Sequence, residues 1–352
     1  MKEIILNDKE VSDDLFPFAL IRHTADIRIG ILTIREKWER LLDLPVALHS
    51  ENPPPSNNAF SIAANVIPSK DFTSALVQSN YNSRPEPGTN ICKVIQYPWN
   101  IFQFNDWALR EDFELLTKGR ISIAIPQTVH AINPKNIFIE EGAVLSHCSL
   151  NASTGPIYIG KNAEIMDGAM VRGPFALCEG AVVKMGARIY GATTVGPYSI
   201  VGGEVKNSVL FGYSNKSHDG YLGDSVIGEW CNLGAGTSNS NVKNNAGEVK
   251  VYTSVAGHPE NAGIKCGLLM GDYSRSAINT SFNTGTVVGI CSNVYGEGLT
   301  PNFIPGFSWG YKPIKKYEFE KAIRDIANWK KLKGKIVTEK EITQLRNIFN
   351  QS

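Results

Sequence analysis

The stretch from 157 to 241 carries a six-residue repeat, which restricts the possible folds more than any other part of the chain. Eight aliphatic residues follow one another at intervals of six: Ile159, Ile165, Val171, Leu177, Val183, Ile189, Val195 and Val201. The positions four residues further on are mostly small or β-branched: Ala163, Ala169, Phe175, Ala181, Ala187, Thr193, Ser199 and Val205. A period of six fits neither a helix nor a single strand, so the repeat predicts a solenoid of short strands and turns. The aliphatic side chains would fill its axis, and glycines such as Gly160 and Gly168 would allow tight corners.

Composition restricts where such a chain works and what it binds. At 352 residues with 42% hydrophobic residues, the chain is long enough for two or more packed units. No run approaches the roughly 20 apolar residues of a membrane span, and the first fifteen residues carry seven charged side chains, which a secretory signal would not contain. We therefore expect a soluble, cytoplasmic protein with no membrane partner.

Net charge and cysteine spacing exclude further classes. The formal net charge of +1 argues against a nucleic-acid partner, since such proteins usually present a basic face. The six cysteines lie far apart and form no C-x-x-C pair, so we expect neither a disulfide framework nor a metal site.

Residues 1–120 form a different unit, which we expect to be a small α/β domain. A β-branched run from Ile27 precedes a helix that should end near Leu42, with Thr33 and Glu36 as its capping box. Stretches 51–58 and 82–90 have loop composition, and helical spacing follows Pro98.

The repeat occupies residues 121–300 and is interrupted twice. The first break covers 207–220 and the second 238–263, after which a third block follows at Met270, Ser276, Phe282, Val288 and Val294. Interruptions of a solenoid gather on one face and often form its site. After Pro301 we expect the chain to leave the solenoid, and helices over 317–332 and 338–349 to cap its open end.

The hexads resemble the left-handed parallel β-helix of the hexapeptide-repeat acyltransferases. Three pieces, 203–208, 217–228 and 231–237, also resemble the acetyltransferase half of bacterial bifunctional N-acetylglucosamine-1-phosphate uridyltransferase in order and spacing. The resemblance implies a mainly β fold, a left-handed β-helix with a small N-terminal α/β domain and C-terminal helices, and a homotrimer with active sites between subunits. It implies acetyl-CoA as donor and an amino-sugar 1-phosphate or sugar nucleotide as acceptor.

The same resemblance assigns roles to eight residues. His218 matches the general base, Arg188, Lys206 and Tyr221 match the groups that hold the sugar phosphate, and Asn232 and Asn241 match pocket asparagines. Ala235 and Thr237 would lie near the thioester.

The residue types suit this chemistry. An imidazole accepts the amine proton at neutral pH, and paired cations suit a sugar phosphate. Simpler interpretations stay open. Arg188 and Lys206 could be charges on the exterior of a solenoid, and Asn232 and Asn241 could be corner residues in the left-handed backbone conformation.

The N-terminal unit departs from the bifunctional enzymes. The stretch 15–28 contains no glycine, so the phosphate-cradling loop is missing, and the unit is short. It resembles instead a variant family of sugar nucleotidyltransferases in 28–38 and 97–99. Arg22, Arg28, Arg35 and Lys37 are candidates for a phosphate site or for structural contacts. The alternatives are therefore a Mg²⁺-dependent sugar-1-phosphate nucleotidyltransferase and a non-catalytic, trimeric sugar-nucleotide-binding scaffold.

Overall fold

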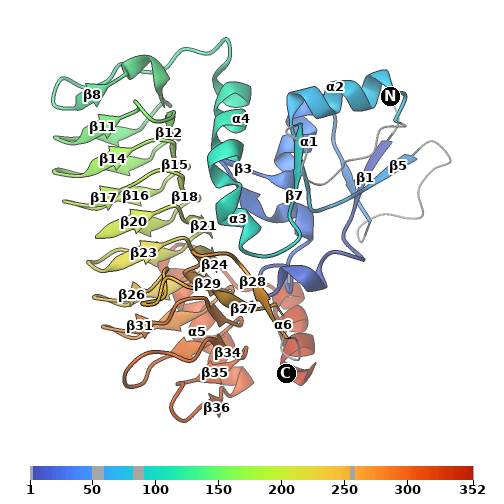
Figure 1. Cartoon of the computed structure of the whole chain (residues 1–352), viewed down its shortest axis with the longest axis vertical. Helices are drawn as coiled ribbons and strands as arrows, with labels where there is room; N and C mark the ends of the chain where they lie inside the picture. The colour runs from blue at the N-terminus through green and yellow to red at the C-terminus, as the bar shows by residue number, and fades with distance from the viewer. Residues whose placement is uncertain (1–2, 50–58, 82–90, 254–257, 352) are drawn as a thin grey trace.

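A computed structural model describes residues 3–49, 59–81, 91–253 and 258–351. A tall solenoid stands beside a smaller N-terminal unit, and two C-terminal helices lie at the lower end (Figure 1). The loops expected over 51–58 and 82–90 lie outside the described residues. None of the helices in the described part of the chain is both long and apolar enough to cross a membrane.

The solenoid has three faces, each a sheet built mostly of parallel strands. The ten-stranded face consists of β10 (Val144–Leu145), β13 (Glu164–Ile165), β16 (Val182–Val183), β19 (Ile200–Val201), β22 (Asn215–Lys216), β25 (Asn232–Leu233), β30 (Arg275–Ser276), β33 (Asn293–Val294), β35 (Ser308–Trp309) and β36 (Lys315–Lys316). The six-stranded face consists of β8 (His130–Ile132), β11 (Ser149–Asn151), β14 (Met170–Arg172), β17 (Arg188–Ile189), β20 (Glu204–Lys206) and β23 (Tyr221–Gly223). The nine-stranded face consists of β9 (Ile137–Ile139), β12 (Ile157–Ile159), β15 (Phe175–Leu177), β18 (Thr193–Val195), β21 (Val209–Gly212), β24 (Val226–Glu229), β29 (Leu268–Met270), β32 (Thr286–Val288) and β34 (Phe303–Ile304).

The predicted solenoid is confirmed, and the hexad residues fill its axis. All eight aliphatic positions from Ile159 to Val201 are at most 2% exposed and belong to one core cluster. Each strand pairs in register with the strand one coil away, so that Ile159 lies beside Leu177 and Leu177 beside Val195. The third block, from Met270 to Val294, continues the same core.

The prediction that the chain leaves the solenoid after Pro301 is wrong. β34 and β35 still pair in parallel with β32 and β33, and Ile304 lies beside Val288 in the core. Successive core residues on this face are 18 apart from Met270 to Val288 but 16 apart from Val288 to Ile304, so the six-residue pattern hides the last coil.

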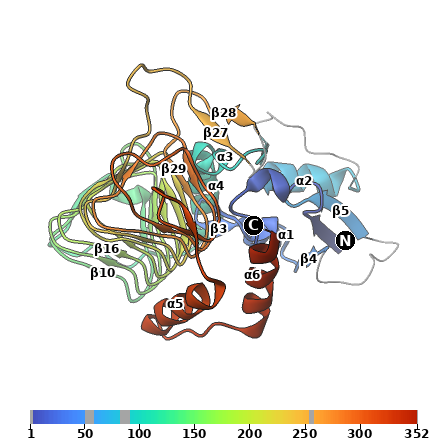
Figure 2. The same cartoon turned by 90° about the horizontal axis from the view of Figure 1, so that it is seen from below.

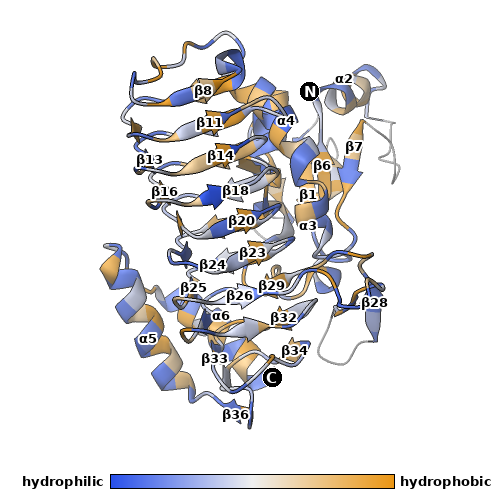
Figure 3. Cartoon of the chain, turned by 60° about the vertical axis from the view of Figure 1, so that its left-hand side comes forward, coloured by the Kyte–Doolittle hydropathy of each residue, from blue (hydrophilic) through white to orange (hydrophobic). Residues whose placement is uncertain are grey.

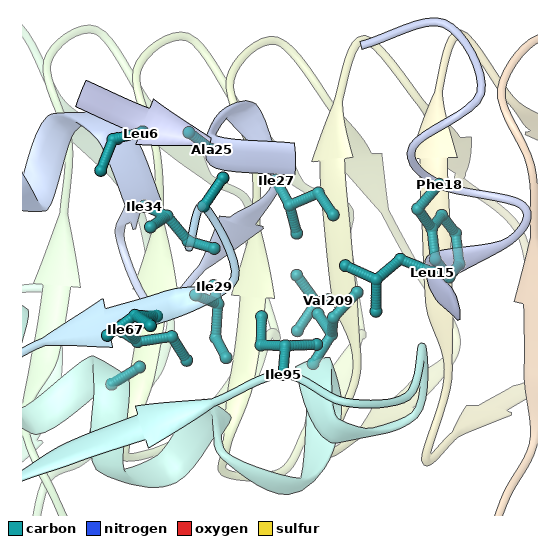
Figure 4. Close-up of a cluster of buried hydrophobic side chains, with 14 of the residues drawn as sticks. Leu6, Leu15, Phe18, Ala25, Ile27, Ile29, Ile34, Ile67, Ile95 and Val209 are labelled. Carbon is teal, nitrogen blue, oxygen red and sulfur yellow. The ribbon is translucent and has the colours of Figure 1, made fainter. Parts of the chain in front are cut away.

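The N-terminal unit is a small α/β arrangement around a three-stranded parallel sheet in the order β4-β1-β5. Its strands are β1 (Glu3–Asn7), β2 (Arg28–Ile29), β3 (Leu32–Thr33), β4 (Ala47–Leu48), β5 (Ala59–Ala63), β6 (Val66–Pro68) and β7 (Cys92–Val94). Helix α1 (Ile34–Leu42) begins at the predicted capping box of Thr33 and Glu36, and α2 is Lys70–Gln78. Side chains of this unit, such as Ile27 and Ile29, pack towards Val209 of the solenoid (Figure 4).

Two helices link the unit to the nine-stranded face, as the spacing after Pro98 predicted. They are α3 (Asn100–Gln103) and α4 (Asn105–Thr117). The buried Asn105 accepts from the N–H of Gly30 at 2.7 Å and donates to the carbonyl of Ala192 at 2.8 Å. Thr194 donates to the carbonyl of Gly30 at 2.9 Å, so unit and solenoid share one hydrogen-bond network.

The C-terminal helices form where predicted but do not lie across the open end of the solenoid. Helix α5 (Phe319–Leu332) runs along its side, and α6 (Glu339–Gln351) stands beside it (Figures 2 and 3). The corner between the nine- and ten-stranded faces carries stacked aromatic rings of Tyr198, Tyr213 and Trp230. Lys330 lies over the Trp230 ring, and this apolar corner explains why the helices pack laterally.

Candidate functional site

The turn that carries His218 joins the ten-stranded face to the six-stranded face. His218 is exposed, and its imidazole forms no hydrogen bond with any described residue. Behind it, Lys216 points into the solenoid axis, where it is 1% exposed. Its ammonium donates to the carbonyls of His218 at 2.5 Å and Gly202 at 3.3 Å, and burial lowers the pKa of Lys216 to about 8. An internal lysine therefore holds the turn from behind.

The glycine-rich turn of the next coil packs directly against the His218 turn. The N–H of Gly236 donates to the carbonyl of Asp219 at 3.1 Å. The N–H of Ala235 donates to no acceptor in the described part of the chain, so it is available to a ligand. Thr237 is 1% exposed, and its hydroxyl bonds to Ser276 and to the carbonyl of Ala277. Of the two residues predicted near the thioester, only the half-buried Ala235 thus has a polar group without a partner among the described residues.

Three predicted sugar-phosphate ligands lie on the six-stranded face. Arg188, Glu204 and Tyr221 occupy the same register position on β17, β20 and β23, with Arg188 Nε 3.6 Å from a Glu204 oxygen. Lys206 is exposed, lies beside Gly223 on the next strand and has no ion pair with any described residue. Of the two cations among these predicted ligands, Lys206 is free and Arg188 is partly neutralised.

The phenol of Tyr221 lies over Gly223. A Cβ on Gly223 would stand 2.1 Å from the Tyr221 hydroxyl, so only glycine leaves room for the ring. The hydroxyl accepts from Asn241 Nδ2 at 3.1 Å, which brings the predicted Asn241 into the cluster. Burial, with the charges of Asp224 and Glu204, raises the pKa of Tyr221 to about 12.

The structure does not bring Asn232 into this cluster. Asn232 lies on the ten-stranded face, where its Oδ1 is 3.5 Å from Asn215 Nδ2. Lys333, just beyond α5, donates to Asn215 at 3.3 Å. Within one chain, Asn232 and Tyr221 are on different faces of the solenoid.

Asp224 contacts this cluster although sequence reasoning did not select it, and Asn207 contacts the other oxygen of Asp224. Asp224 accepts from Asn207 at 2.6 Å and from Asn241 at 2.5 Å. These residues recur every 17 positions, because the coils that carry Asn207, Asp224 and Asn241 are one residue shorter than the regular coils of 18. A search at a period of 17 would have found them.

The four N-terminal cations considered for a phosphate site make internal contacts. Arg22 pairs with the buried Asp272 of the solenoid at 2.7 Å, and Arg35 pairs with Asp26 at 2.7 Å.

The other two are held as firmly. Arg28 donates to the carbonyls of Phe211, at 3.1 Å, and of Ile31, and the buried Lys37 pairs with Asp112. Their positions favour the structural reading, in which these cations tie the unit together and to the solenoid. Within residues 3–49, 59–81, 91–253 and 258–351, no group of three or more His, Cys, Asp or Glu residues could hold a metal ion.

Comparison with known proteins finds relatives for both parts of the chain. Residues 4–84 and 61–121 match a family model described as sugar nucleotidyl transferase. A bifunctional protein GlmU from Methanococcus maripaludis is 27% identical over 263 residues, covering 73% of this chain and 57% of that protein. A bifunctional sugar-1-phosphate nucleotidylyltransferase/acetyltransferase from Sulfurisphaera tokodaii is 32% identical over 232 residues, covering 62% and 51%.

The chain thus spans just over half the length of these curated relatives. The matches confirm the resemblance to the bifunctional enzymes and to the sugar nucleotidyltransferases.

Solved structures give a weaker likeness. The Francisella novicida UDP-N-acetylglucosamine acyltransferase is 14% identical with a TM-score of 0.37, covering 64% of this chain and 79% of that chain. The Arabidopsis UDP-N-acetylglucosamine acyltransferase is 13% identical with a TM-score of 0.30, covering 65% and 90%. Scores this low support no functional argument, so the left hand of the solenoid stays a prediction.

Proposed function

We propose that this chain is an acyltransferase that moves the acetyl group of acetyl-CoA to the amine of an amino-sugar 1-phosphate or a related sugar nucleotide. The observation that carries the proposal is the hydrogen bond from Gly236 to Asp219. It holds the His218 turn against the turn with the free Ala235 N–H. A base and an oxyanion donor are thereby neighbours, next to the face that carries Lys206 and Tyr221. The name of the Sulfurisphaera tokodaii relative, a sugar-1-phosphate nucleotidylyltransferase/acetyltransferase, agrees with a role in sugar nucleotide biosynthesis, which we place in the cytoplasm.

In the proposed reaction the substrate amine attacks the thioester carbonyl, and His218 removes a proton from the amine nitrogen. The negative charge that develops on the carbonyl oxygen is stabilised by the N–H of Ala235. The intermediate then collapses to the amide as the C–S bond breaks, and the leaving thiolate of coenzyme A takes the proton that His218 had removed. Lys206 and Arg188 hold the phosphate as charged hydrogen-bond donors.

The test follows free thiol released from acetyl-CoA in the presence of glucosamine 1-phosphate. We expect His218→Asn to lower the rate by roughly 10² to 10⁴, the usual contribution of a general base. His147 is the matched control, because it is an exposed histidine in the equivalent turn of an earlier coil, bonded to Ser146. His147→Asn should leave the rate unchanged. If the wild type releases no thiol, or both variants retain its rate, the proposal is refuted.

We further propose a homotrimer whose sites lie between subunits. The separation of Asn232 from Tyr221 within one chain supports it, because a shared site would let one subunit supply each. Light scattering gives the oligomeric state. Mixing inactive His218→Asn with inactive Asn232→Ala subunits, after unfolding and refolding together, should restore part of the activity if the sites are shared. No recovery would place both residues in a site from one chain.

A second candidate is sugar-1-phosphate nucleotidyl transfer by the N-terminal unit with Mg²⁺, which the family model over residues 4–121 favours. The internal pairing of Arg22, Arg28 and Lys37 speaks against it. Pyrophosphate release from a nucleoside triphosphate and a sugar phosphate with Mg²⁺ would establish this activity. Sugar-nucleotide binding without either turnover would instead indicate a non-catalytic scaffold.

A further inference from the structure

A buried carboxylate lies beside Tyr221 and Asn241 and has no part in the reaction written above. Asp224 follows β23 directly and is 3% exposed. Its Oδ1 accepts from Asn207 Nδ2 at 2.6 Å, and its Oδ2 accepts from Asn241 Nδ2 at 2.5 Å. Asp224 is therefore held between two asparagine amides from neighbouring coils.

This carboxylate determines which way the Asn241 amide points. An ionised carboxylate only accepts hydrogen bonds, so the Asn241 atom next to it has to be the nitrogen. The same nitrogen donates to the Tyr221 hydroxyl at 3.1 Å, and an amide nitrogen carries two protons. Both donors of Asn241 are thus in use, while its Oδ1 accepts nothing from the described residues.

The Tyr221 hydroxyl, in contrast, still has a hydrogen-bond donor to offer. Its oxygen accepts from Asn241, and its proton is given to no described acceptor. Because the pKa of Tyr221 is raised to about 12, the phenol keeps this proton at neutral pH. Together the two side chains offer one acceptor and one donor next to the free cation of Lys206.

We propose that Asp224 is a positioning residue for the acetyl transfer. Asp224 accepts one N–H of the Asn241 side chain, and the Tyr221 hydroxyl accepts the other. The Asn241 carbonyl oxygen is thereby left to accept a hydrogen bond from the substrate amine. Tyr221 in turn donates its proton to the phosphate-bearing sugar. The inference rests on the proposed function and narrows its substrate class to a molecule that carries an N–H donor and an anionic acceptor close together.

A double-mutant cycle tests it. In Asp224→Asn the carboxylate becomes an amide that can donate as well as accept. The side-chain amide of Asn241 can then flip, which exchanges the positions of its oxygen and nitrogen. We expect kcat to fall about tenfold to a hundredfold, as for a misplaced reactant, with the KM for acetyl-CoA unchanged. In an Asn241→Ala background, Asp224→Asn should cause no further loss. Equal losses in both backgrounds would overturn the proposal, because Asp224 would then act independently of Asn241.

Asn207→Gly is the matched control. It removes the other amide from Asp224, keeps the Asn241 contact and suits the positive φ of 45° at this position. Its kcat should stay within about twofold of the wild type. A loss as large as that of Asp224→Asn would show that Asp224 matters only to local folding.

A measurement on the wild type separates this inference from the proposed function. The side-chain amide protons of Asn241, assigned by their loss in Asn241→Ala, should exchange with solvent more slowly than those of the exposed Asn244. Equal exchange would overturn the inference even if acetyl transfer is observed. Slow exchange without thiol release would refute the proposed function and leave the Asp224 contact standing.

Discussion

The ammonium of Lys216, inside the solenoid, donates a hydrogen bond to the backbone carbonyl of His218 at 2.5 Å. Lys216 occupies a core position, because the pairing of β19 with β22 places it beside the core residue Val201 of the preceding coil. A charge in the axis of a β-solenoid costs stability unless it is paired or neutralised, and this lysine has only carbonyl partners among the described residues. The buried lysine that holds the turn of the candidate base His218 therefore lowers the stability of the fold.

The first prediction concerns pH. Unfolded, Lys216 keeps its proton up to a pKa of 10.5, but burial lowers its folded pKa to about 8. Between these values the unfolded chain binds more protons, so the free energy of unfolding should rise with pH. Relative to Lys216→Met, the wild type should gain on the order of 3 kcal/mol from pH 8 to 10.5. Chemical denaturation at several pH values measures it, and parallel curves for the two proteins would contradict it.

The second prediction concerns the Arg22–Asp272 pair that ties the N-terminal unit to the solenoid. Arg22→Met should lower the free energy of unfolding by about 3 to 5 kcal/mol, because it leaves a buried carboxylate without its partner. The double variant Arg22→Met/Asp272→Asn should recover much of this loss. Urea denaturation provides the measurement, and a double variant less stable than Arg22→Met would contradict the account.

The third prediction concerns Gly220, in the His218 turn. A Cβ there would stand 2.0 Å from the carbonyl oxygen of Thr237, at a φ of +121°. Gly220→Ala should therefore displace the turn and lower both activity and stability, the latter by more than about 2 kcal/mol. Gly119→Ala is the control, because Gly119 also has a positive φ, +74°, but no atom within 4 Å. Its cost should be only about 1 kcal/mol, with full activity.

The fourth prediction concerns Lys206, an exposed cation of the six-stranded face that lies beside the Tyr221 strand. Lys206→Met should raise the KM for the sugar phosphate about tenfold or more, since a hydrogen bond to a charged group contributes roughly 1.5 to 3 kcal/mol. The KM for acetyl-CoA should stay the same. Lys161→Met changes another exposed lysine of the solenoid and should alter neither value. An equal rise for both variants would mean that only the overall charge matters.

The features that could be predicted from the sequence are those that depend on residues close together in the chain. The axis of the solenoid was predictable because each strand from β12 to β19 places its hexad residue inside, so the repeat from Ile159 to Val201 indicates the fold directly. The capping box of α1 was predictable for the same reason, since Thr33 and Glu36 are close in sequence.

Contacts between coils were not predictable in this way. The partnership of Asn207, Asp224 and Asn241 depends on coils of 17 residues, and the last coil at Ile304 depends on one of 16. The lateral position of α5 depends on an aromatic corner assembled from three coils, which no local pattern announces.

The covering of the solenoid has a consequence for how copies of this chain can associate. The N-terminal unit and α4 bury much of the nine-stranded face, through residues such as Val209, Tyr158 and Ala176. Helix α5 covers the corner between that face and the ten-stranded face. The edge where the ten- and six-stranded faces join, which carries the exposed His218, is covered by neither of these elements and so stays open to a second copy.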